Sequence, residues 1–143
     1  MDTIECGTAA CAIQIGNDGI ATEVYGGLLL PRNIPQIALS ALQAAAGRQA
    51  KGLLTRLDQA ALCCDPAAVA VSAYSSLTPA MRALPKAYVV NRGQIALCNA
   101  LPRGGGGAGL LRAVFLREDD AREWLDRTTR ALAANQDWWA GRG

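Results

Sequence analysis

Two adjacent cysteines, Cys63 and Cys64, are the residues whose type and position best suit covalent chemistry. They directly precede Asp65 and Pro66, a pair typical of a helix N-terminus, where the helix dipole can lower the pKa of a thiol. The sequence contains no histidine, which excludes Ser-His-Asp and Cys-His catalysis and every zinc site that needs histidine. In a thiol-dependent enzyme, the helix dipole, an arginine or a lysine would therefore have to lower the pKa of the thiol. The simpler interpretation is that both cysteines are small core residues.

A glycine-rich segment, residues 104–109, is flanked by Arg103 and Arg112. Backbone N–H groups of such loops can bind phosphate, and the two arginines could hold a small anion. No Gly-Lys-Ser/Thr follows, and the segment leads into a predicted strand, so a flexible linker is favoured over a nucleotide loop. The acidic run 118–120 could bind a metal, but its place in the first turn of a predicted helix explains it. We therefore predict no metal site and no cofactor.

The composition indicates one folded domain over residues 1–143. Apolar residues make up 51% of the chain and charged residues 18%, which is too apolar for a disordered protein. A net charge of +2 gives no electrostatic reason to expect nucleic acid or an anionic membrane as a partner. There is no signal peptide pattern and no apolar run of the roughly 18–20 residues that a membrane span needs. Because an odd number of cysteines suits a reducing compartment, we expect a cytoplasmic protein.

The first half of the chain predicts a hairpin, a helix and a strand. Residues 10–15 and 20–25 are β-prone runs joined by Gly-Asn-Asp-Gly, a sequence suited to a tight turn. Residues 26–32 are predicted to be a connector. A helix is expected from about residue 33 to Gly47. Its apolar residues recur at intervals of three and four and form one stripe: Ile34, Ile37, Ala38, Ala41, Leu42 and Ala45. A strand follows at residues 52–57, with a continuation at 60–62.

The second half predicts helices that alternate with strands. Asp65-Pro66 and Thr78-Pro79 each pair a capping residue with proline, which predicts a helix, a break and a helix within residues 66–84. Residues 86–91 form a contiguous apolar strand expected inside the sheet between parallel neighbours. A short helix over 95–101 and a strand over 111–116 complete the sheet. The predicted fold class is α/β, with a mixed, mostly parallel sheet, an N-terminal β-hairpin and three to four helices.

The last helix is expected to begin at residue 118 and to end near Asn135. Its predicted buried stripe consists of Ala121, Trp124, Leu125, Thr128 and Leu132. Residues 134–143 form a C-terminal tail that contains Trp138 and Trp139. Because two tryptophans are costly to leave in water, we expect the tail to turn and pack on its own domain, on a second copy or on another protein.

Three stretches of this sequence are similar to one family. Residues 52–65 resemble the central strand and the aspartate before the regulatory helix of the STAS superfamily, and residues 87–90 resemble its next strand. Residues 112–125 resemble its last strand and the following helix with its Ala-x-x-Trp-Leu pattern. The order of elements is closest to the SpoIIAA-like branch, which contains anti-sigma-factor antagonists. The resemblance implies a non-enzymatic module that binds a protein.

The sequence departs from this family where the phosphorylated serine is expected. The family has a Ser-Ser-Gly type turn after the aspartate, whereas Pro66 and Ala67 follow Asp65 here. Neither residue can carry a phosphate, so the resemblance implies binding without the switch. The partner is expected to be a protein or a second copy, with a small anionic or lipophilic ligand as another candidate. The predicted binding residues are Asp65, Pro66, Ala67, Arg103, Arg112, Trp138 and Trp139. The alternative is a small ligand-binding or thiol-dependent enzyme domain that uses Cys63 or Cys64.

Overall fold

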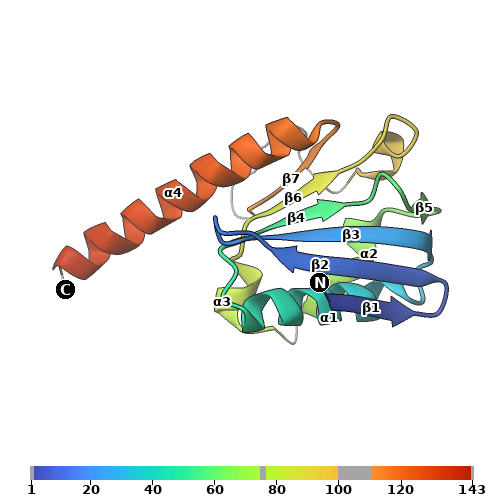
Figure 1. Cartoon of the computed structure of the whole chain (residues 1–143), viewed down its shortest axis with the longest axis horizontal. Helices are drawn as coiled ribbons and strands as arrows, with labels where there is room; N and C mark the ends of the chain where they lie inside the picture. The colour runs from blue at the N-terminus through green and yellow to red at the C-terminus, as the bar shows by residue number, and fades with distance from the viewer. Residues whose placement is uncertain (1, 75–76, 100–110, 143) are drawn as a thin grey trace.

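The computed structural model of the chain describes residues 2–74, 77–99 and 111–142, and it forms a sheet with helices on both faces (Figure 1). The strands are β1 (Asp2–Cys6), β2 (Ala9–Ile15), β3 (Ile20–Leu29), β4 (Gly52–Arg56), β5 (Ala61–Leu62), β6 (Lys86–Val89) and β7 (Arg112–Phe115). The helices are α1 (Ile34–Gly47), α2 (Pro66–Tyr74), α3 (Pro79–Arg82), the short 3₁₀ helix η1 (Ile95–Leu97) and α4 (Glu118–Arg142).

The sheet is mixed, as the sequence predicted. Its strand order is β1-β2-β3-β4-β6-β7, and β5 pairs with the end of β3. The pairs β1–β2 and β2–β3 are antiparallel, whereas the pairs from β3 to β7 are parallel. The predicted internal position of the strand at residues 86–91 is confirmed, because β6 lies between the parallel strands β4 and β7.

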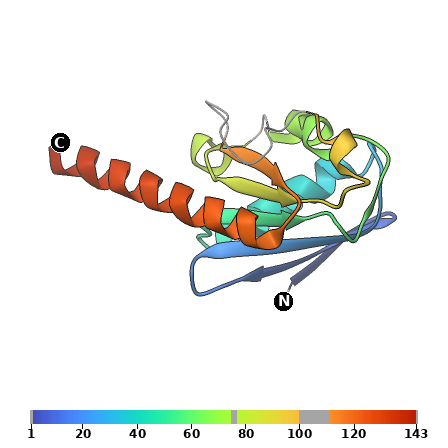
Figure 2. The same ribbon diagram turned by 90° about the horizontal axis from the view of Figure 1, so that it is seen from above.

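Two hydrophobic cores lie on opposite faces of the sheet (Figure 2). One face is covered by α1 and α2, and the predicted apolar stripe of α1 is confirmed, since all six of its residues are buried there. The other face carries α4, which packs on β4, β6 and β7 through Ala121 and Leu125. Trp124 is half-buried and contacts Phe115, with ring centroids 5.8 Å apart.

The predicted turn and helix caps are also confirmed. In the β2–β3 turn, the carboxylate of Asp18 accepts a hydrogen bond from the N–H of Ile20, and Gly19 has a φ of 81°. The hydroxyl of Thr78 accepts a hydrogen bond from the N–H of Met81 and caps α3. These features depend on residues close in the sequence, which is why the sequence alone predicts them.

The structure corrects the predicted N-terminal region in two places. An additional strand, β1, pairs with β2 as the edge of the sheet. Only Ile4 and Cys6 of this strand pack on the core, while Asp2, Thr3 and Glu5 are exposed, so its alternation is too short to indicate a strand from the sequence. The segment expected to be a connector, residues 26–32, instead begins with four more residues of β3, which extends to Leu29. The strand passes through the two glycines at 26–27.

The structure also corrects the end of the last helix. α4 does not end near Asn135 but continues to Arg142, so residues 134–142 do not turn back as the expected tail would. No proline interrupts this region, and alanine and glutamine favour a helix. Beyond its first two turns α4 extends away from the sheet (Figures 1 and 2). In the described part of the chain, no helix is both long enough and apolar enough to cross a membrane.

Candidate functional site

The start of α2 is built by Asp65, which caps the helix. Its Oδ1 accepts hydrogen bonds from the backbone N–H groups of Ala67 at 3.1 Å and Ala68 at 3.3 Å. Pro66 and Ala67 form the first turn and are buried, so they anchor the helix to the domain. The predicted site residues Asp65, Pro66 and Ala67 are therefore together, and the two positions after the aspartate carry no hydroxyl group.

Two exposed small residues flank this helix start. We define the α2 cap surface as Cys63, directly before the helix, and Ala68 in its first turn. Leu28 and Ala61 are also exposed, but they pair across β3 and β5 on the side opposite to Leu29 and Leu62, which pack in the core with α1, so they lie on the other face of the sheet. The Cys63 thiol donates to the carbonyl of Leu29 at 3.6 Å, which holds the loop before α2 against β3. Exposed apolar residues beside a rigid cap are suited to protein contact.

The Cys64 thiol is poorly suited to nucleophilic chemistry. Burial raises the pKa of the Cys64 thiol, and the neighbouring Cys63 and Asp65 raise it further. A raised pKa lowers the fraction of thiolate, which is the reactive form, at neutral pH. Within the described residues, no group of three or more acidic or cysteine side chains is placed to hold a metal ion.

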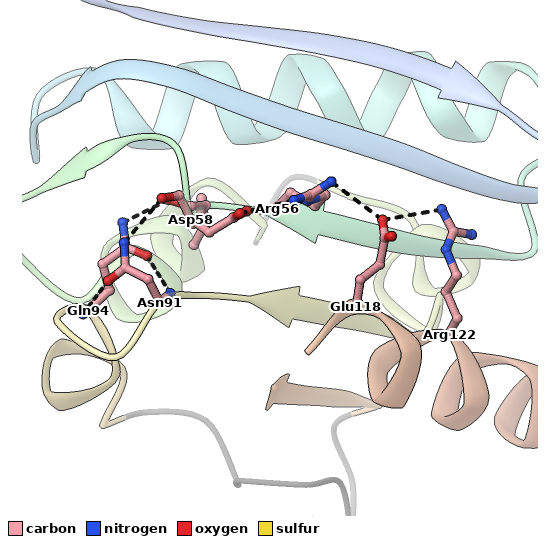
Figure 3. Close-up of polar contacts among 7 residues, drawn as sticks. Arg56, Asp58, Asn91, Gln94, Glu118 and Arg122 are labelled. Carbon is pink, nitrogen blue, oxygen red and sulfur yellow. Dashed lines mark hydrogen bonds and ion pairs between the residues drawn. The ribbon is translucent and has the colours of Figure 1, made fainter. Parts of the chain in front are cut away.

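A polar network fixes the loop between β4 and β5, which leads to the α2 cap surface (Figure 3). The buried Gln94 donates from Nε2 to the carbonyls of Leu57, at 2.7 Å, and Ala60, at 2.8 Å. Its Oε1 accepts from the N–H of Asn91, whose own side-chain amide donates to the carbonyl of Asp58. Gln94 and Asn91 were not predicted from the sequence. Asn91 ends the predicted strand at 86–91 and Gln94 follows it, so polar residues at the end of this strand were the signal that could have indicated them.

Charged side chains extend this network along the same edge of the sheet (Figure 3). Arg56 forms ion pairs with Asp58 at 3.0 Å and with Glu118 at 3.6 Å, and Glu118 also pairs with Arg122 at 3.5 Å. The hydrogen bond to Asp58 raises the pKa of Arg56, which keeps its guanidinium charged. Glu118 therefore links the start of α4 to β4, in addition to its favourable place at a helix N-terminus.

A second polar cluster is buried between the sheet and α1. The carboxylate of Glu23 accepts a hydrogen bond from the Thr55 hydroxyl at 2.6 Å and lies 3.8 Å from the ammonium group of Lys86. Glu23 and Lys86 are almost completely shielded from solvent, at 0% and 1% exposure. Lys86 also lies over the ring of Tyr88, 5.0 Å from its centroid. A cavity of only about 20 Å³ adjoins Lys86 and Thr55, roughly the space of one water molecule.

The remaining predicted site residues are not part of the α2 cap surface. Arg112 is buried in β7, and its Nη1 donates to the Tyr88 hydroxyl at 3.4 Å. Its guanidinium therefore lies inside the domain on the side of α1 and α2. Arg103 and the glycine-rich segment lie outside the described residues. Trp138 and Trp139 belong to the last turns of α4.

Comparison with known proteins identifies the class of fold. No family model matches the chain, and a search of curated proteins found no match. Among solved structures, an anti-sigma factor antagonist from Mycobacterium paratuberculosis is similar, with 13% identity, a TM-score of 0.53, and coverage of 82% of this chain and 94% of that one. An uncharacterized DUF3478 family protein with a SpoIIAA-like fold from Shewanella loihica PV-4 shares 15% identity, with a TM-score of 0.48 and coverage of 82% and 93%.

The chain therefore has the STAS/SpoIIAA-like fold that its sequence resemblance predicted. The similarity covers most of both chains. At 13% sequence identity, the similarity shows the fold alone.

Proposed function

We propose that the protein is a non-enzymatic regulatory module that binds a protein partner through the α2 cap surface, without a phosphoserine switch. The observation that carries the proposal is the start of α2, where Asp65 caps the helix and Pro66 and Ala67 stand where the family has its serine turn. The similar mycobacterial protein is an anti-sigma factor antagonist, so an anti-sigma factor is the partner class that the fold favours.

The electrostatics of the helix start support binding that phosphorylation does not regulate. Phosphorylation acts by adding nearly two negative charges at a helix end, and it needs a hydroxyl group there. Here the carboxylate of Asp65 already occupies the free N–H groups of α2. Phosphorylation at the start of α2 therefore does not change the charge of the α2 cap surface. We infer that the concentration of the partner alone determines whether the partner is bound.

The other candidate functions have weaker support. A small anionic or lipophilic ligand would need more room than the cavity of about 20 Å³ beneath α2 provides. A thiol-dependent enzyme is disfavoured by the raised pKa of Cys64. All five cysteines are free, which suits a reducing compartment, and we propose a cytoplasmic location.

A single substitution tests the binding surface. Ala68→Arg adds a long charged side chain at an exposed position of the α2 cap surface, and we expect it to weaken binding at least tenfold. Binding is measured by surface plasmon resonance against the anti-sigma factors encoded in the same genome. Gln43→Arg, at an exposed position of α1, is the matched control and is expected to bind normally. Equal affinity of the two variants would show that the partner binds elsewhere.

A further inference from the structure

Cys63 and Cys64 form a pair of adjacent thiols whose combined chemistry the proposed function does not use. Cys63 is exposed and Cys64 is half-buried, and both residues lie in the bend between β5 and α2. Adjacent residues of a strand point to opposite faces, but a bend has no such restriction. Here the two thiols interact, because after burial the charge of Cys63 and a hydrogen bond with it raise the pKa of Cys64. The two side chains therefore converge at the surface.

The bend that carries the pair is held on both sides. Before it, β5 pairs with the end of β3, and the Cys63 thiol donates to the carbonyl of Leu29 at 3.6 Å. After it, the carboxylate of Asp65 caps α2. The loop that leads into β5 is fixed by the hydrogen bonds of Gln94 (Figure 3). Because the chain already holds both thiols in place, a ligand that binds both orders few additional groups.

The other three cysteines differ from this pair. Cys11 and Cys98 are shielded from solvent, so a thiol reagent does not reach them in the folded chain. Cys6 is half-buried, its thiol donates to Oε1 of Gln36 at 3.5 Å, and its neighbours in the sequence are not cysteines. Residues 63 and 64 are therefore the accessible pair of adjacent thiols.

The spacing of the pair favours one bridging atom over a direct disulfide. Adjacent Cα atoms are about 3.8 Å apart, whereas the Cα atoms of ordinary disulfides are about 4.4–6.8 Å apart. A direct bond between these two sulfurs would therefore be strained. An atom that bonds each sulfur at about 2.3 Å, as zinc does, leaves the two sulfurs roughly 3.5–4 Å apart. That separation is compatible with two thiols in hydrogen-bond contact.

The number of ligands decides which bridging atom fits. Structural zinc takes four protein ligands, and the described residues contain no group of three or more acidic or cysteine side chains that could supply them. A trivalent arsenic atom with one carbon substituent needs only two sulfur ligands, which is the number that the bend provides.

We propose that Cys63 and Cys64 form a binding site for a trivalent organoarsenical, whose arsenic atom both thiols chelate. Such a compound, in its hydrated form, carries two exchangeable hydroxyl groups on arsenic. Two As–S bonds form and two As–O bonds break, and each departing hydroxyl takes a thiol proton and leaves as water. No electrons are transferred, so the reaction needs no oxidant or reductant. The proposal goes beyond the proposed function and does not depend on a protein partner.

The protonation state of the pair is compatible with this exchange. The raised pKa of Cys64 lowers its thiolate fraction, which disfavours nucleophilic catalysis. In the exchange with arsenic, the thiol proton leaves with the hydroxyl group that is displaced. A thiol that is protonated at neutral pH therefore still supplies one of the two sulfur ligands.

Native mass spectrometry of the reduced full chain with phenylarsine oxide tests the site. We expect one adduct per chain, with the mass of one phenylarsenic group less two hydrogens, and peptide mapping should place it on residues 63–64. Cys63→Ser and Cys64→Ser should each raise the apparent Kd at least about a hundredfold, because loss of one thiol removes the intramolecular second bond. Cys6→Ser is the matched control and should bind with wild-type affinity. Circular dichroism checks folding, and Cys64→Ala replaces Cys64→Ser if serine disturbs the fold.

Three results would overturn the proposal. A folded, reduced wild-type chain that forms no adduct would do so directly. A wild-type Kd in a folded Cys63→Ser or Cys64→Ala variant would show that the two thiols do not act together. Loss of the adduct in a folded Cys6→Ser variant would show that the arsenic binds at Cys6 instead. None of these measurements involves a protein partner, so their failure is distinct from failure of the proposed function.

Discussion

Replacement of Lys86 by methionine is expected to lower the free energy of unfolding by about 3–5 kcal/mol. The ammonium group of Lys86 lies 3.8 Å from the carboxylate of Glu23, and both side chains are shielded from solvent. Removal of the lysine charge leaves the carboxylate buried among the strands, and one of its oxygens already has no hydrogen-bond partner. A buried charge without compensation is costly because the protein interior solvates it poorly. Urea denaturation at one fixed protein concentration measures the change.

The chain offers a matched control for this substitution. Lys51 is exposed, so Lys51→Met makes the same chemical change without removing a buried charge, and we expect an effect within about 0.5 kcal/mol. Combining Lys86→Met with Glu23→Gln should recover part of the loss, because the uncompensated carboxylate is removed. Equal stability of the Lys86→Met and Lys51→Met variants would contradict the described ion pair.

Substitution of Gly27 by alanine is expected to cost at least about 2 kcal/mol and to lower the melting temperature by about 4–8 °C. Gly27 has a φ of 78°, which residues with a side chain adopt only with strain. An added Cβ would lie 2.1 Å from the carbonyl oxygen of Thr8, so the backbone must move. That carbonyl accepts a hydrogen bond from the N–H of Leu28, which joins the start of β2 to the end of β3.

The neighbouring glycine provides the control. An added Cβ at Gly26 would meet no atom within 4 Å, and its φ is not positive, so Gly26→Ala should change stability by no more than about 0.5 kcal/mol. Differential scanning calorimetry of the two variants gives the comparison. If both variants melt at the same temperature as the wild type, β2 and β3 do not approach as closely as described.

The sequence predicts those parts of the fold that local chemistry determines. The apolar stripe of α1, the turn between β2 and β3 and the caps at Asp65 and Thr78 all depend on residues within a few positions of one another. The internal strand β6 was predicted because the contiguous apolar residues within 86–91 need cover on both faces. At the candidate site, the absence of a phosphate acceptor at Pro66 and Ala67 is also visible in the sequence alone.

Contacts between distant segments could not be predicted in this way. Glu23 and Lys86 lie on strands separated by β4, and only the register of the sheet brings them together. Gln94 contacts the carbonyls of Leu57 and Ala60 across more than thirty residues. The prediction for α4 was wrong at its end because it assumed that the apolar stripe finishes with the sheet. Nothing in the local sequence stops the helix before Gly141.

The measurement that most directly tests the account is the affinity for the kinase-type anti-sigma factor of the same genome, before and after incubation with that partner and ATP. Isothermal titration calorimetry gives the affinity, and mass spectrometry maps any phosphate. The account predicts binding with the same affinity in both cases, because Pro66 and Ala67 offer no hydroxyl at the start of α2. Stoichiometric phosphate between Asp65 and Ser76, together with a loss of affinity, would contradict it.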